Sequence, residues 1–268
     1  MMPRTLQFAA ARARRKGRGC IDTAGTRLNG SGMTTQAPVP RIVDRNEWQR
    51  LRQDLLEREK AHMRAGDALA AARRRLPMVP MEPVELVGAK GNVSLLDVFE
   101  GRRMLLAYFF MWKRGAPHHR QCDGCTHVIS QVSPAVQAYL AERDVTYAVF
   151  SQGPYQELAA YRDFMGWTMQ WYSTERAGDA LATRSGGDVR SFLNHDGKVF
   201  LTYETSGRGT ECGLITLRLL DLTPYGRQET WEDSPAGYPQ TQAGAWWGRN
   251  GRPVAQWTVT DEPITSEK

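Results

Sequence analysis

The chain has 268 residues, a formal net charge of +6 and 41% hydrophobic residues, which is enough apolar content to fill a sizeable core. No stretch approaches the roughly 20 apolar residues that a membrane-spanning helix needs, so we predict a globular, soluble protein without a membrane partner. Six basic residues near the N-terminus account for the whole net charge, and the other 29 lysines and arginines equal the 29 acidic residues. The folded part therefore has no basic excess of the kind that favours nucleic acid, and we expect no such partner.

Residues 1–40 form an Arg-rich, acid-poor leader that ends at Pro38 and Pro40. A secretory signal would need an apolar run after the basic residues, whereas this leader continues into polar and glycine-rich sequence. We predict a disordered segment, with Met33 as the true start of the protein. The four cysteines are also too few and too scattered for a disulfide framework, which favours a cytoplasmic location.

Residues 41–76 are predicted to form an N-terminal helix. Asp44, followed three residues later by Glu47, is typical of a helix start. Apolar residues from Trp48 to Leu76 recur at steps of three and four, which indicates one apolar stripe. This stripe either packs on the main domain or pairs with a second copy of the chain, so we keep a homodimer through this helix as an alternative.

Residues 77–226 are predicted to form the main α/β domain. The continuous apolar run at 104–112 indicates a central strand buried on both faces. A helix is predicted after it at 128–143, with a break near Ser133 because Pro134 follows. A strand at 145–150, a helix at 155–165 and an extended piece at 170–173 then indicate a parallel βαβ core. Asp196 and Gly197 predict the turn of a later hairpin. Residues 227–268 are predicted to be an irregular, Trp-rich C-terminal extension.

The strongest chemical motif is the pair Cys122 and Cys125, placed between the predicted central strand and a helix. A thiolate at a helix N-terminus is stabilised by free backbone N–H groups and by the helix dipole, so Cys122 is the expected nucleophile and Cys125 the resolving thiol. His118 and His119 could add positive charge nearby, although loop histidines are also commonly solvated. Asp123 between the sulfurs would disfavour the thiolate unless its side chain turns outward.

Metal binding is the competing chemistry. Five sulfur and imidazole donors lie within ten residues, namely Cys122, Cys125, His118, His119 and His127. The spacing does not match a structural zinc site, which usually draws a second ligand pair from a separate knuckle. Two idle thiols are the remaining alternative. Cys20 is interpreted as a leader thiol and Cys212 as a core residue.

Four segments resemble a known bacterial family: residues 45–48 (RNEW), 55–60 (LLEREK), 73–77 (RRRLP) and 222–227 (LTPYGR). The chain resembles the thioredoxin-like family called domain of unknown function 899 over about residues 41–240. The resemblance implies a thioredoxin-like fold with an N-terminal helical extension and a dithiol site at Cys122 and Cys125, but no established activity. One departure from classical thioredoxins is that no proline occurs between Pro154 and Pro224, where those proteins place a cis-proline facing the cysteines.

We therefore predict a thioredoxin-like central sheet flanked by helices, and a thiol-disulfide oxidoreductase or thiol peroxidase-like activity that uses Cys122 and Cys125. No cofactor is expected, and the partner would be a thiol, a disulfide or a small peroxide. The alternative is a metal- or ligand-binding protein of the same fold without redox turnover.

Overall fold

The computed structural model describes residues 38–183, 187–262 and 264. The predicted leader at 1–40, with Cys20 and Met33, lies almost wholly outside this range. None of the helices in the described part is both long enough and apolar enough to cross a membrane.

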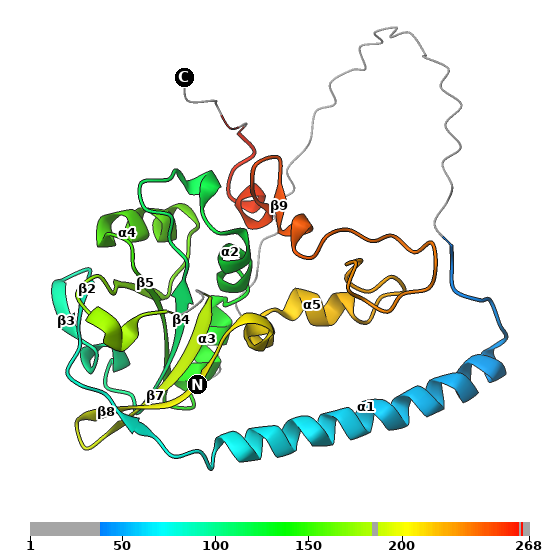
Figure 1. Cartoon of the computed structure of the whole chain (residues 1–268), viewed down its shortest axis with the longest axis horizontal. Coiled ribbons are helices and arrows are strands. Elements are labelled where there is room, and N and C mark those ends of the chain that lie inside the picture. Colours follow the sequence, from blue (N-terminus) through cyan, green and yellow to red (C-terminus); the bar gives the residue numbers. More distant parts are fainter. Residues whose placement is uncertain (1–37, 184–186, 263, 265–268) are drawn as a thin grey trace, which may run out of the picture. The chain divides into compact units, whose positions relative to one another are not determined.

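Within the described residues, eight strands form one mixed sheet in the order β1-β8-β7-β4-β5-β6-β2-β3 (Figure 1). Three neighbouring strands are parallel, as the predicted βαβ core requires, and the others add to them in antiparallel fashion. The parallel strands are β4 (Met104–Phe110), β5 (Val145–Ser151) and β6 (Gln170–Ser173). The remaining strands are β1 (Val79–Pro80), β2 (Glu85–Gly88), β3 (Gly91–Ser94), β7 (Asp188–His195) and β8 (Lys198–Thr205). The predicted central strand is confirmed as β4, which lies between β5 and β7.

The helices that follow β4 show the predicted break. They are α2 (Asp123–Ile129), α3 (Pro134–Ala141), α4 (Tyr155–Phe164) and α5 (Ile215–Leu220). Ser133 caps the N-terminus of α3 by accepting a hydrogen bond from the Val136 N–H, and Pro134 takes the first helical position, where its missing N–H costs nothing. The predicted start at residue 128 was wrong, because α2 begins at Asp123, directly after Cys122.

Side chains of β4 alternate between the two faces of the sheet, because successive residues of a strand point to opposite sides. Phe109 joins one core cluster, which also contains Phe99, Phe150 and Phe192. Tyr108 and Phe110 join the other, together with residues of α2, α4 and α5. The cysteine pair belongs to this second, aromatic-rich cluster.

The N-terminal helix is present as α1 (Arg45–Arg73), and the Asp44 side chain accepts the Glu47 N–H as expected of an N-cap. No residue of α1, all of which is described, is buried. Its apolar stripe stays open to solvent, with Trp48 46% and Leu51 54% exposed. Packing of this stripe on the main domain is therefore wrong, and pairing with a second copy stays a prediction.

The C-terminal extension, residues 227–268, is irregular as predicted where it is described. It contains short 3-10 turns and a two-stranded ladder of β9 (Gly248–Arg249) and β10 (Arg252–Pro253). Trp246 packs against the second core cluster, so this segment is part of the folded body. The interpretation of Cys212 as a core residue was wrong: it lies exposed in the 3-10 segment η4 (Gly207–Gly213) before α5.

Candidate active site

The loop that leads from β4 to the cysteine pair is closed by one buried side chain, Gln121. Its amide oxygen accepts the Lys113 N–H at 3.0 Å, and its amide nitrogen donates to the carbonyls of Lys113 and Ala116, both at 2.9 Å. Only 1% of Gln121 is exposed. Because a buried amide with satisfied hydrogen bonds is costly to displace, Gln121 holds the loop and the cysteine after it in place.

Cys122 is the N-cap of α2, so its sulfur lies over the free N–H groups of the first turn. The Cys122 Sγ accepts the Cys125 N–H at 3.3 Å. Its pKa is lowered to about 7, chiefly by the hydrogen bond from the Cys125 thiol and further by backbone N–H groups and the charge of Lys113, against the opposing effect of burial. At neutral pH a large fraction of Cys122 is therefore thiolate, the reactive form of cysteine.

Cys125 lies beneath Cys122 in the core and is 1% exposed. Its pKa is raised well above the usual cysteine value, first because its thiol donates to Cys122 and second because burial disfavours the charged form. Two donors oppose this shift: the Met111 N–H, 3.4 Å from the sulfur, and the Tyr108 hydroxyl. The two sulfurs thus have different ionisation at neutral pH, with Cys122 tending to thiolate and Cys125 remaining a thiol.

The charged residues next to the pair are Asp123 and Lys113. Burial raises the pKa of the Asp123 carboxyl, and the Lys113 charge partly opposes that shift. The carboxyl faces the backbone of the C-terminal extension, since a Cβ on Gly248 would lie only 2.9 Å from Asp123 Oδ2. Asp123 is thus turned toward the extension, and the positive charge that lowers the pKa of Cys122 is that of Lys113.

The histidines have other neighbours. The His118 ring packs on Tyr161 and Phe164, with ring centroids 5.2 and 4.8 Å away, and burial lowers its pKa. The His127 Nε2 is 2.6 Å from Thr216 Oγ1, and burial lowers the pKa of this ring too. Both rings therefore favour the neutral form and add no charge to the thiolate. Across the described residues, no three His, Cys, Asp or Glu side chains are arranged to hold a metal ion.

The C-terminal extension lies on the first turn of α2. The Trp247 ring is so close to Gly124 that a Cβ there would lie 2.8 Å from the ring. The His127 ring meets Trp246 and Trp247 edge-on, at 5.3 and 5.6 Å between centroids. Glycine between the cysteines thus has a packing reason, because only a residue without a side chain admits this indole.

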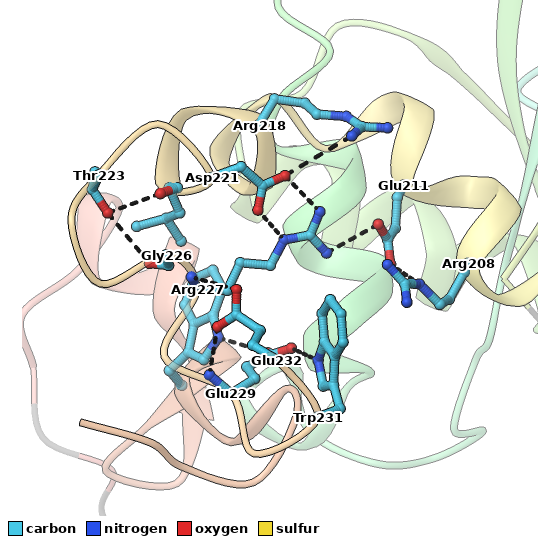
Figure 2. Close-up of polar contacts among 12 residues, drawn as sticks. Arg208, Glu211, Arg218, Asp221, Thr223, Gly226, Arg227, Glu229, Trp231 and Glu232 are labelled. Carbon is cyan, nitrogen blue, oxygen red and sulfur yellow. Dashed lines mark hydrogen bonds and ion pairs between the residues drawn. The ribbon is translucent and has the colours of Figure 1, made fainter. Parts of the chain in front are cut away.

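The extension is held by a buried polar network around Arg227 (Figure 2). The guanidinium donates two hydrogen bonds to the Asp221 carboxylate, at 2.7 and 2.9 Å, and a third to Glu211 at 3.0 Å. Only 4% of the Arg227 side chain is exposed. Paired geometry of this kind fixes orientation as well as charge.

The same network continues into the tryptophans. The Glu232 carboxylate accepts the backbone N–H groups of Arg227 and Glu229. The Glu229 carboxylate in turn accepts the indole N–H of Trp231 at 2.6 Å and that of Trp246 at 2.9 Å. The residues at 222–227, first noted for their family resemblance, therefore begin the chain of contacts that places Trp246 beside α2.

A pocket of about 350 Å³ opens beside the buried cysteine. The residues that line it include Tyr108, Met111, Cys125 and Gly187. The other lining residues come from α2, from η4 with Leu214 after it, and from the extension: Gly124, Val128, Gly207, Arg208, Thr210, Glu211, Leu214 and Trp247. Solvent therefore reaches the neighbourhood of Cys125 through this pocket.

Gly187 occupies the position just before β7, where its N–H donates to the Phe109 carbonyl at 3.0 Å. Its φ of +68° is a conformation that glycine adopts without strain. The described residues contain no cis peptide bond, in agreement with the missing proline in this part of the sequence. Gly187 thus presents glycine backbone to the pocket that Cys125 also lines.

Three residues of the site escaped the sequence analysis: Tyr108, Lys113 and Gln121. Tyr108 belongs to an apolar run, and strand periodicity predicts only the face of the sheet on which its side chain lies. The periodicity does not predict the polar contact of its hydroxyl. Gln121 and Lys113 stand in a loop whose path the sequence pattern does not reveal. The sequence offered one indication of such a role: a polar residue, Gln121, directly precedes Cys122.

The sequence matches the family described as "Bacterial protein of unknown function (DUF899)" over residues 37–252. No curated protein matches it. Among solved structures, an uncharacterized thioredoxin-like protein from Porphyromonas gingivalis is similar at 18% identity, with 51% of this chain and 87% of that chain covered and a TM-score of 0.37. Peroxidoxin BcpB from Mycobacterium tuberculosis is similar at 15% identity, with coverage of 54% and 99% and a TM-score of 0.36. Because the family match spans residues 37–252, most of the chain, the protein belongs to the bacterial DUF899 family.

Proposed function

We propose that the protein is a thiol-disulfide oxidoreductase in which Cys122 and Cys125 cycle between a dithiol and a disulfide. The observation that carries this proposal is the division of roles between the two sulfurs. Cys122 caps α2 with a pKa near 7, while Cys125 is buried, protonated and hydrogen-bonded to Cys122. A nucleophile at the surface and a resolving thiol beneath it are the two parts that dithiol chemistry needs.

The reaction begins when the Cys122 thiolate attacks one sulfur of a substrate disulfide. The substrate S–S bond breaks, its other sulfur leaves as a thiolate, and a mixed disulfide forms on Cys122. Cys125 then loses its proton and attacks Cys122 Sγ, which expels the second substrate thiolate. The protein is oxidised by two electrons to the Cys122–Cys125 disulfide, and the substrate is reduced to two thiols, which take up the Cys125 proton and one from solvent.

The site favours a disulfide over a peroxide as the oxidant. Cleavage of an O–O bond leaves an alkoxide, which needs a proton or a cation at once, whereas a thiolate is a stable leaving group near neutral pH. In the described part of the chain, the hydrogen bonds to Cys122 come from the Cys125 thiol and from backbone N–H groups. The positive charge of Lys113 acts on Cys122 only from a distance.

A redox titration tests the proposal. The protein is equilibrated in dithiothreitol or glutathione buffers of stepped potential, alkylated and weighed by mass spectrometry. We expect one two-electron transition that joins Cys122 to Cys125, and its complete loss in Cys122→Ser, with Cys212→Ser as the control that retains it. A protein that forms no such disulfide in oxidising buffer would refute the proposal. Faster oxidation by a hydroperoxide than by a small disulfide would move the assignment to a thiol peroxidase.

A further inference from the structure

Closing and opening the Cys122–Cys125 disulfide requires a proton to leave or reach Cys125. That sulfur is 1% exposed and lies in the aromatic-rich core cluster. Because almost none of Cys125 is exposed, a polar neighbour that also lines the pocket would carry the proton between the sulfur and water. The geometry around Cys125 should therefore contain such a carrier.

The hydrogen-bonding neighbours of Cys125 are few. The Met111 N–H donates to the sulfur at 3.4 Å, but a backbone amide does not give up its proton at neutral pH. Cys122 is the reaction partner itself and carries the substrate when Cys125 must react. The third neighbour is the Tyr108 hydroxyl, which can donate and accept at the same time.

Tyr108 connects the sulfur to the pocket. It stands on β4 with 2% of its surface exposed, and it lines the 350 Å³ pocket together with Cys125 and Gly187. A Cβ on Gly187 would lie 3.5 Å from the Tyr108 hydroxyl, so that hydroxyl lies next to Gly187, another residue that lines the pocket. Its oxygen therefore faces Cys125 on one side and solvent-accessible space on the other.

The carboxylates nearby are engaged elsewhere. Glu211 also lines the pocket, but its two oxygens accept from Arg208 and Arg227, at 3.0 Å each. Asp123 is turned toward Gly248 of the extension and is not among the residues that line the pocket. Neither is hydrogen-bonded to Cys125, so the tyrosine hydroxyl is the group with the required position.

We propose that Tyr108 is a catalytic proton relay that passes a proton between Cys125 and water in the pocket each time the Cys122–Cys125 disulfide opens or closes. This inference rests on the proposed function, because the relay serves the resolving cysteine of that cycle. Burial raises the pKa of Tyr108 above its usual value, so the side chain remains a neutral phenol that relays a proton without storing a charge.

A dithiol such as dithiothreitol reduces the Cys122–Cys125 disulfide in two successive displacement steps. A thiolate of the reductant attacks Cys122 Sγ, the Cys122–Cys125 bond breaks, and its electron pair goes to Cys125. Tyr108 donates its hydroxyl proton to the Cys125 thiolate and receives one from water in the pocket. The second thiol of the reductant gives its proton to the hydroxide left in the pocket and attacks the reductant sulfur of the mixed disulfide. That bond to Cys122 breaks, Cys122 leaves as a thiolate, and the reductant becomes a cyclic disulfide.

The test is the rate at which dithiothreitol opens the Cys122–Cys125 disulfide, followed by acid quench, alkylation and mass spectrometry. We expect Tyr108→Phe to open at least about tenfold more slowly, as the loss of a hydrogen-bonding acid from a reacting group implies. The wild-type rate should fall in heavy water, and the variant should lose this dependence. Alkylation of Cys122 in the reduced variant should proceed within about twofold of wild type, since the hydrogen bonds to Cys122 come from the Cys125 thiol and from backbone N–H groups, which the substitution keeps.

Tyr172→Phe is the matched control, because Tyr172 is a partly buried tyrosine of the opposite core cluster, packed near Gly88. It should leave the rate and its heavy-water dependence unchanged. A Tyr108→Phe protein that opens at the wild-type rate would overturn the relay while leaving the redox proposal intact. Should Tyr108→Phe fail to fold, a wild-type rate without heavy-water dependence would overturn the relay equally. Absence of the disulfide in wild type would instead refute the proposed function.

Discussion

Two helices of this protein, α1 and α2, reverse what their sequences suggest about burial. The long α1 has a capped start and a regular apolar stripe, yet none of its described residues is buried. The short α2 has seven residues and a glycine near its start, yet four of its residues are buried, Cys125, Thr126, Val128 and Ile129. This difference shows that an apolar stripe marks the face on which a helix can pack. Whether that face is buried depends on which other segment of the chain packs against it.

The segment that reaches α2 is the C-terminal extension. Trp246 and Trp247 lie on α2, and the Arg227 and Glu229 hydrogen bonds hold the segment that carries them. No comparable segment covers α1 within the described residues, where its contact with the sheet includes Arg73 stacked over the Tyr203 ring at 5.2 Å. Substitutions can therefore loosen the C-terminal extension from α2, or test the same kind of change in α1 and in α2.

The largest effect on stability is expected from Arg227→Met. The change leaves Glu211 and Asp221 without their buried partner, and such losses cost about 2–4 kcal/mol when the carboxylates are partly exposed, as these are. Urea unfolding measures the change. Arg218→Met is the matched control, because Arg218 is 59% exposed and only 3.9 Å from the same Asp221, and its loss should cost less than about 0.5 kcal/mol. Equal stability of the two variants would contradict the anchoring role of Arg227.

A Gly→Ala substitution should lower stability in α2 and raise it in α1. Gly124→Ala in α2 drives a methyl group into Trp247 and should destabilise the protein by about 1–2 kcal/mol. Gly66→Ala in α1 meets nothing within 4 Å and should stabilise that helix by about 0.5–1 kcal/mol through better helix propensity.

Urea unfolding and circular dichroism measure both glycine variants. Adding Trp247→Ala to Gly124→Ala should recover part of the loss, because it removes the ring that the new methyl group strikes. A Gly124→Ala protein as stable as wild type would show that Trp247 does not rest on α2.

The half-buried Cys122 thiol that caps α2 should titrate near neutrality. With its pKa lowered to about 7, Cys122 is half thiolate at that pH, so alkylation should accelerate as the pH rises toward 7 and level off above about 8. Lys113→Met removes a positive charge that favours the thiolate, so the midpoint should move to higher pH. Lys198→Met, at the far hairpin, should leave it in place. A midpoint near the ordinary cysteine value would contradict the geometry of the α2 N-cap.

The smallest effect on the fold itself is expected from changes on the α1 stripe. Leu51→Glu with Leu55→Glu alters exposed positions and should change the unfolding free energy by less than about 0.5 kcal/mol per site. Its effect should appear in self-association instead, because pairing with a second copy is predicted to use this stripe. Light scattering should give twice the chain mass of 30.2 kDa for the wild type and a monomer for the variant.

Gln53→Glu, on the opposite face of α1, is the control for the stripe variant and should remain a dimer. A wild-type chain that scatters as a monomer at micromolar concentration would end the predicted pairing through α1.

The local sequence determined the elements and much of the site. Several features depend only on residues close together in the sequence and could therefore be predicted from it. They are the apolar run at 104–112, the cap at Asp44, the turn at Asp196 and Gly197, and the break before Pro134. Cys122 and Cys125 were found in the same way, because their spacing and the elements around them are local features. The family resemblance extended this to the thioredoxin-like arrangement of the sheet.

Only the tertiary structure decided what surrounds the two sulfurs. Tyr108 stands fourteen or more residues before either cysteine, Trp247 more than a hundred residues after them, and Lys113 in a loop whose path depends on Gln121. Burial against aromatic rings lowers the pKa of His118 and of His127, and the sequence around either histidine does not show those rings. The physical reason is common to all of these cases: pKa, burial and proton exchange depend on distances through space, and residues far apart in the sequence set those distances.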